Sequence, residues 1–95
     1  MLEIKIDKQF KKDIKRDKQS GKYKASDFEI LKSIMDTLID GNTPDEKYYP
    51  HKLVGDWKGY CECHIKPNWI LIYKKTDSLI NFARVGTHQQ LFSNF

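Results

Sequence analysis

The sequence lacks the features that identify membrane proteins and several common classes of enzyme. Its longest apolar run, Trp69 to Tyr73, is far shorter than the roughly 18 residues of a membrane-spanning helix. Charges appear from Glu3 onward, so the start has no apolar signal-peptide core, and we expect a cytoplasmic protein with no membrane partner. The sequence also lacks a glycine-rich phosphate loop, a nucleophilic serine flanked by glycines and a carboxylate cluster for magnesium. It therefore has no motif of the enzymes that depend on one of these three sites.

Cysteine is scarce, and its spacing is unsuited to a disulfide or to zinc. The two cysteines, Cys61 and Cys63, would lie on one face of a strand, where they are poorly arranged to bond each other. A zinc site would need a second pair of ligands, and His64 should point away from both thiols. We therefore expect two buried thiols in a reducing compartment, with no metal and no cofactor.

The 95 residues, 39% hydrophobic and 32% charged, predict one small globular domain over 1–95 with a single core. The net charge of +4 is unevenly distributed, because basic regions at 5–24 and 51–95 flank an acidic region at 25–50. This pattern is typical of a protein that holds a polyanion on part of its surface. For the first basic region, a solvated helix face explains the charge equally well.

The first half of the chain predicts one strand and two helices. Alternating residues favour a short strand at 2–6, with Leu2, Ile4 and Ile6 facing inward. A surface helix then follows Asp7 and ends by Gly21, with a thin apolar stripe. The main core helix begins with a capping-box pattern at Ser26 and Glu29 and ends near residue 41.

The second half predicts a loop and three strands. The polar loop at 42–56 contains the exposed-looking pair Tyr48-Tyr49 and is long enough to carry function. Strands are expected at about 58–65, 69–75 and 79–85. The order β-α-α-β-β-β predicts an α+β sandwich of two layers, in which an antiparallel sheet carries two N-terminal helices on one face and leaves its concave face free for binding.

The residues that could carry chemistry are concentrated in the C-terminal half. His51, His64 and His88 can exchange protons near neutral pH, and Arg84 offers a planar cation that fits phosphate oxygens. Two histidines and an arginine supply the base, the acid and the charge that metal-free RNA cleavage requires. Glu62, on the same strand face as His64, is the one acid placed to help. The alternative is that the histidines are scattered surface residues.

Aromatic side chains in the same half offer stacking surfaces for unpaired bases. Three of them are candidates for that role: Tyr60, Trp69 and Phe92. Each tryptophan is by itself more typical of a core than of a binding platform.

The C-terminal half resembles the YafQ-type toxins of the RelE/ParE superfamily. The residues that carry the resemblance are Trp57-Lys58-Gly59-Tyr60, His64, Pro67, Trp69 to Tyr73, Arg84, Gly86-Thr87-His88 and Leu91-Phe92. The resemblance covers about 51–92 closely. It implies a RelE-like fold and a ribosome-dependent endoribonuclease that cuts mRNA and stops translation. It also implies a cognate antitoxin that wraps and neutralises the toxin, with DNA met only indirectly through that antitoxin.

The resemblance implies roles for individual residues. His64 and His88 would transfer protons, His51 would transfer a proton or position phosphate, and Arg84 would stabilise the transition state. Trp69 and Phe92 would shape the site or stack on the nucleotide. We also expect Lys58, Tyr60 and Asn68 to bind RNA or shape the site.

Two positions depart from the family pattern. Asn68 stands where the family has an acidic residue, so it cannot exchange a proton but can still orient a neighbour. Pro50-His51-Lys52 stands where the family more often has His followed by Pro. Two rival functions stay open: a non-catalytic module that binds antitoxin or RNA, with Asn68 as the sign of lost activity, and a ParE-like protein acting on DNA gyrase, which the histidines disfavour.

Overall fold

The computed structural model describes residues 2–92. The elements follow in the order β1 (Glu3–Ile6), α1 (Lys8–Ser20), α2 (Ala25–Ile39), η1 (Glu46–Tyr48), β2 (His51–Lys52), η2 (Gly55–Trp57), β3 (Cys61–Lys66), β4 (Trp69–Lys75), β5 (Leu79–Gly86) and α3 (His88–Phe92), where η1 and η2 are single 3₁₀ turns. The predicted α+β class and the predicted order are confirmed. The short β2 and α3 were not predicted.

The sheet has five strands in the order β1-β5-β4-β3-β2. Strands β2 to β5 pair antiparallel, but β1 pairs parallel with β5, with Glu3 opposite Leu79, so the expectation of a wholly antiparallel sheet is wrong at this edge. Helices α1 and α2 separate β1 from the other strands in the sequence, so β1 can pair with the last strand, β5. The inward orientation predicted for β1 is also wrong, since Ile4 and Ile6 are 48% and 40% exposed on an edge strand with one neighbour.

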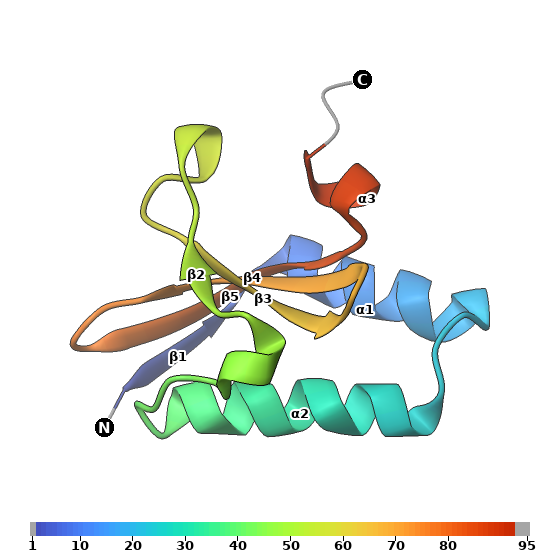
Figure 1. The fold of residues 1–95 in the computed structure, drawn as a ribbon, viewed down its shortest axis with the longest axis horizontal. Coiled ribbons are helices and arrows are strands. Elements are labelled where there is room, and N and C mark those ends of the chain that lie inside the picture. The colour runs from blue at the N-terminus through green and yellow to red at the C-terminus, as the bar shows by residue number, and fades with distance from the viewer. Residues whose placement is uncertain (1, 93–95) are drawn as a thin grey trace.

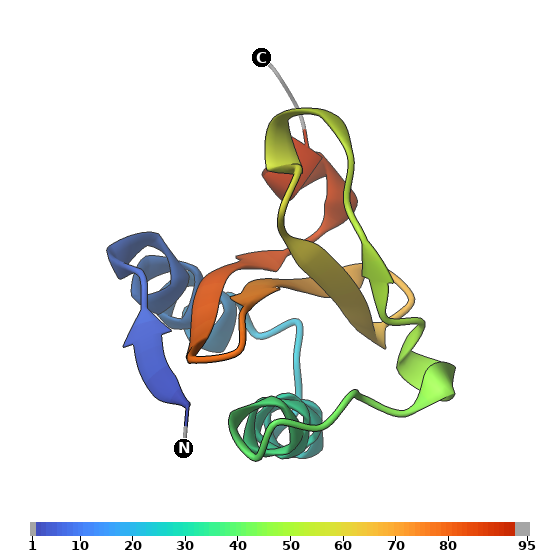
Figure 2. The same ribbon diagram turned by 90° about the vertical axis from the view of Figure 1, so that its left-hand side faces the viewer.

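Both N-terminal helices pack into one core on one face of the sheet, as predicted. Figure 1 shows α2 below the sheet and α3 above it, and Figure 2 shows α1 beside the strands. The core joins the helices to the lower face of the strands through Phe10, Leu31, Ile34, Leu38, Leu71, Tyr73 and Phe82. A smaller cluster on the opposite face contains Ile70, Ile72, Ala83 and Leu91 and seats α3. That opposite face carries the candidate site.

The helix ends agree with the sequence in part. Helix α1 ends at Gly21, whose φ of 75° is the left-handed conformation that glycine adopts without strain. Helix α2 begins at Ala25, so the capping box predicted at Ser26 is wrong: the Asp27 carboxylate accepts from the Lys24 N–H at 2.8 Å. None of the helices within 2–92 is long and apolar enough to cross a membrane.

Candidate active site

A buried carboxylate lies between two histidines on the face opposite α2. Strand pairing places His51 of β2 directly across from Glu62 of β3, and His64 follows two residues later on the same face. Glu62 is only 5% exposed, and its Oε1 lies 2.9 Å from His51 Nε2 and 3.5 Å from His64 Nε2. A carboxylate this deeply buried is costly unless it has a partner, so the imidazoles stabilise it.

His88 reaches the same cluster from the start of α3. Its ring centroid lies 5.5 Å from that of His64, which in turn lies 6.2 Å from that of His51. Three histidines from three separate elements therefore form one continuous row. These are the same three histidines that the sequence indicated as candidates for proton transfer, and their catalytic role stays a prediction.

Asn68, in the turn between β3 and β4, fixes the protonation pattern of His88. Its Oδ1 accepts from the His88 backbone N–H at 3.0 Å and lies 2.9 Å from His88 Nδ1. Because the backbone N–H can only donate, this atom is the amide oxygen, and Nδ1 must therefore carry a proton. The other ring nitrogen, Nε2, is left with a lone pair when the ring is neutral.

His51 lies between two acceptors. Its Nδ1 is 2.8 Å from the carbonyl oxygen of Tyr49, and its Nε2 faces Glu62. Each contact needs a proton between its two atoms, so both can be hydrogen bonds only if His51 carries two protons or if Glu62 carries one. Glu62 Oε2 and His64 Nε2 are buried without a hydrogen-bond partner in the described part of the chain. Unsatisfied buried polar atoms are rare in folded proteins and favour a functional site.

The cluster also has the donor set of a metal site. Glu62, His64 and His88 each offer one ligand atom, and these atoms lie within 4.8 Å of one another. Two imidazoles and a carboxylate suit zinc and copper. The residues fit such an ion, and the same side chains are the ones that proton transfer would need.

Aromatic rings flank the histidine row at both ends. Tyr49 lies 4.5 Å from His51 between ring centroids, and Phe92 lies 6.0 Å from His88. Phe92 was predicted from the sequence as a stacking residue, whereas no site role was predicted for Tyr49. The available signal was an exposed-looking tyrosine pair two residues before a candidate histidine.

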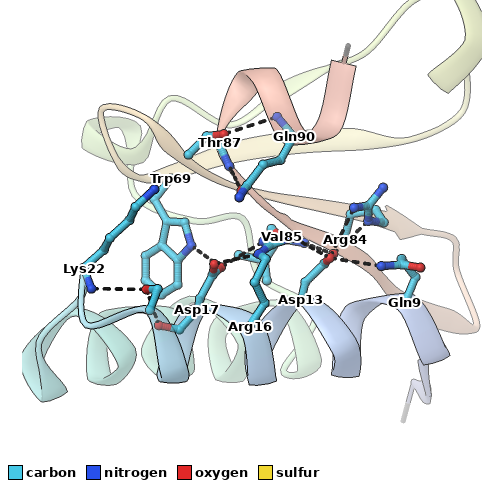
Figure 3. Close-up of polar contacts among 11 residues, drawn as sticks. Gln9, Asp13, Arg16, Asp17, Lys22, Trp69, Arg84, Val85, Thr87 and Gln90 are labelled. Carbon is cyan, nitrogen blue, oxygen red and sulfur yellow. Dashed lines mark hydrogen bonds and ion pairs between the residues drawn. The ribbon is translucent and has the colours of Figure 1, made fainter. Parts of the chain in front are cut away.

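Trp69 is not available to stack on a nucleotide, so that part of its expected role is wrong. It is fully buried on the helix side of the sheet, where its indole stacks on Tyr23 at 4.1 Å. Its Nε1–H donates to Asp17 Oδ2 at 2.9 Å, as Figure 3 shows. Trp69 thereby anchors the start of β4, directly after Asn68, so any influence on the site is through that turn.

Arg84 is held by an acidic side chain of α1. By register it shares a sheet face with Glu62, but its Nε donates to Asp13 Oδ2 at 2.7 Å and its Nη2 to Oδ1 at 3.2 Å (Figure 3). Asp13 also accepts from the Val85 N–H at 3.1 Å. Burial by itself raises the pKa of the Asp13 carboxyl, but hydrogen bonds from Arg84, Val85 and Gln9 outweigh it and hold that pKa below its ordinary value. Arg84 thus fastens α1 to β5, and its contact with phosphate stays a prediction.

Tyr60 and Lys58 lie in the loop between η2 and β3, with Tyr60 directly before the strand. The Tyr60 ring packs edge-on against Trp57 at 5.2 Å, and Lys74 Nζ lies 5.6 Å from its centroid. Lys58 is exposed. Within 2–92 no hydrogen bond, ion pair or ring contact joins either residue to the histidine row, and their role in RNA binding stays a prediction.

Comparison with known proteins places these residues in a wider context. A family model described as bacterial toxin of type II toxin-antitoxin system, YafQ, matches residues 2–93. The chain is 43% identical over 91 residues to the mRNA interferase toxin YafQ of Escherichia coli K12, with 95% of each chain covered. Its structure resembles the toxin in the crystal structure of the E. coli DinJ–YafQ complex, with a TM-score of 0.83, 40% identity and coverage of 98% of this chain and 100% of that one. A metal-bound toxin from Helicobacter pylori is also similar, with a TM-score of 0.82, 31% identity and coverage of 97% and 100%.

Proposed function

The chain belongs to the YafQ family of bacterial type II toxins, and from this premise we propose that it is an mRNA-cleaving endoribonuclease that works on the ribosome. The observation that carries the proposal is the convergence of His51, His64 and His88 around the buried Glu62 carboxylate. The E. coli relative is named an mRNA interferase, which supports the same reaction here.

In the proposed reaction, His88 is the general base. Its Nδ1–H is held by Asn68, so Nε2 takes the proton from a ribose 2′-hydroxyl. The freed 2′-oxygen attacks the adjacent phosphorus, and the bond from phosphorus to the 5′-oxygen breaks. The products are a 2′,3′-cyclic phosphate and a strand that begins with a 5′-hydroxyl.

His64 is the proposed general acid that protonates the leaving 5′-oxygen. Its Nε2 is buried and faces Glu62, which leaves Nδ1 as the nitrogen for the substrate. The Glu62 carboxylate stabilises the protonated ring through its charge. His51, held between Glu62 and the Tyr49 carbonyl, supplies positive charge beside the phosphate when it carries both protons.

A neutralising antitoxin is the proposed protein partner, because the related E. coli toxin has been solved in complex with DinJ. The ribosome and mRNA are the other proposed partners. The chain is basic overall, with a net charge of +4, which favours association with RNA.

The test is cleavage of a defined mRNA in a purified translation system, with and without ribosomes, mapped by primer extension. Wild type, His64→Ala and His88→Ala are compared with Gln89→Ala, an exposed neighbour of His88 and the matched control. We expect cuts only in ribosome-occupied codons, a loss of roughly 10²–10⁴-fold in both histidine variants, and normal activity in the control. If folded wild type binds antitoxin but makes no cuts, the chain is a non-catalytic module.

A further inference from the structure

Tyr49 holds a backbone conformation that tyrosine rarely adopts. Its φ of 52° and ψ of 55° are left-handed, and within 2–92 it is the one residue other than glycine with a positive φ. The residue before a proline is also disfavoured in helical conformations, and Pro50 follows directly. Such strain persists only where surrounding contacts impose it, and it is concentrated at functional sites.

Contacts on both sides of the Tyr49 backbone impose this conformation. Its N–H donates to the Glu46 carbonyl at 2.9 Å, which closes the η1 turn, and its own carbonyl faces His51 Nδ1 at 2.8 Å. The same residue therefore orients a candidate catalytic histidine and turns its own side chain outward.

The Tyr49 ring lies exposed beside the histidine row. The residue is 62% exposed, and its ring lies 4.5 Å from His51 and 5.7 Å from His64, nearly perpendicular to the latter. Large exposed aromatic rings are costly to hydrate, and one with an open face next to a reactive site is suited to stack on a ligand.

A surface cavity of about 390 Å³ adjoins Tyr49 and His64. Its size falls within the roughly 300–1,000 Å³ typical of small-molecule sites. Lys47 and Lys66 also line it, and since Lys66 Nζ lies 3.3 Å from Asp27 Oδ2, an aromatic wall, an imidazole and the Lys47 cation are the groups that the space offers a ligand. A flat aromatic base joined to an anionic phosphate fits that combination.

We propose that Tyr49 is a nucleobase-binding residue on which an unpaired base of the cleaved RNA strand stacks, on the His51 side of the scissile phosphate. This inference rests on the proposed function, since it names the residue that positions the RNA in that site. Trp69, one of the three sequence-based candidates for stacking, is buried on the other face, whereas Tyr49 and Phe92 stand at the two ends of the histidine row. The two rings hold the bases on either side of the reacting phosphate.

The experiment measures binding of short single-stranded RNA with 2′-fluoro riboses, which lack the attacking hydroxyl and so cannot be cleaved at any position. One probe carries 2-aminopurine bases, and a second has the same backbone and charge but abasic sugars. Three Tyr49 variants separate the ring from the backbone. Tyr49→Phe keeps the ring, Tyr49→Asn tolerates the left-handed conformation without the ring, and Tyr49→Gly relieves the strain.

We expect wild type and Tyr49→Phe to quench 2-aminopurine fluorescence and to bind the base-bearing probe about tenfold more tightly than the abasic one, as for one stacked base. Tyr49→Asn and Tyr49→Gly should lose this preference while their affinity for the abasic probe stays as in wild type, and cooperative thermal unfolding of both variants shows that they fold. If wild type shows no preference for bases, or if Tyr49→Asn retains it, the inference is wrong. Because the probes cannot be cut, this result is independent of the cleavage test: a protein that stacks bases but cuts nothing would overturn only the proposed function.

Discussion

The amide oxygen of Asn68 receives two hydrogen bonds from His88, one from the backbone N–H at 3.0 Å and one from ring Nδ1 at 2.9 Å. The backbone bond identifies the oxygen, and the oxygen in turn fixes the ring tautomer. A neutral acceptor at this position orients the imidazole without adding negative charge, so the amide side chain is compatible with a working base. This contact gives Asn68 a positioning role in place of the proton exchange that it cannot perform.

Asn68→Asp should shift the pH dependence of cleavage. A carboxylate stabilises the protonated form of His88, so the rise of rate with pH should move to higher pH and the rate in mildly acidic buffer should fall. Asn68→Ala should lower the rate at every pH, by about tenfold or more, because the base is no longer oriented. Single-turnover rates across the pH range measure both effects. If the pH–rate profile of Asn68→Asp equals that of wild type, residue 68 does not position His88 as the base.

Glu62→Gln keeps the shape of the side chain and removes its charge. We expect cleavage to fall by about 10–100-fold, since neither His51 nor His64 then has an anion to stabilise its protonated form. RNA affinity should change far less than the rate of the chemical step. Glu29→Gln, an exposed carboxylate on α2, is the matched control. Equal rates in Glu62→Gln and wild type would show that Glu62 is only structural.

Asp13→Asn should destabilise the fold by about 3 kcal/mol at pH 7, because it leaves Arg84 without its buried anion. The pKa of Asp13 is held below its ordinary value of 3.8, so its contribution is present above that value and is lost as the pH falls through the lower, folded-state pKa. The difference in the free energy of unfolding between wild type and Asp13→Asn should therefore be largest at neutral pH and shrink in strong acid. Urea unfolding at several pH values measures it, with the exposed Asp56→Asn as control. A stability difference that grows in acid would contradict the view that the ionised Asp13 carboxylate stabilises the fold.

Zinc or copper ions should inhibit cleavage. Glu62, His64 and His88 can converge on one ion, and an ion held there occupies the side chains that proton transfer uses. We expect inhibition at low metal concentration, reversal by a chelator, and no inhibition by magnesium, which prefers oxygen ligands. Calorimetry should show zinc binding that His64→Ala weakens at least tenfold. Unaltered zinc affinity in that variant would place the metal elsewhere.

Charge reversal on α1 should weaken ribosome binding. Lys11, Lys12 and Lys15 are all exposed, so their substitution by Glu leaves the core intact. If these side chains contact ribosomal RNA, affinity should fall most at low salt, where phosphate contacts contribute most. Lys32→Glu on the acidic helix α2 is the control. Unchanged ribosome affinity in the triple variant would leave α1 a solvated face.

The sequence alone determined the class of the fold and the chemistry available to the protein. Residue periodicity encodes which elements form, so the helices, the hairpin of β3 and β4 and the final strand were predicted to within a few residues. His51, His64 and His88 were named as candidate site residues from their chemistry. Periodicity does not encode how distant elements pair, which is why the parallel partnership of β1 with β5 emerged only in the structure.

Tertiary structure alone decided which face each site residue occupies and what it contacts. Strand β4 is buried on both faces from Trp69 to Tyr73, so its unbroken apolar run could not show that Trp69 belongs to the core. Arg84 could not be known to bind Asp13, because the two meet across 71 positions of sequence. The contacts of Glu62 with His51 and of Asn68 with His88 likewise join segments that are separate in the sequence. Their geometry depends on how the whole chain packs, and no local pattern specifies it.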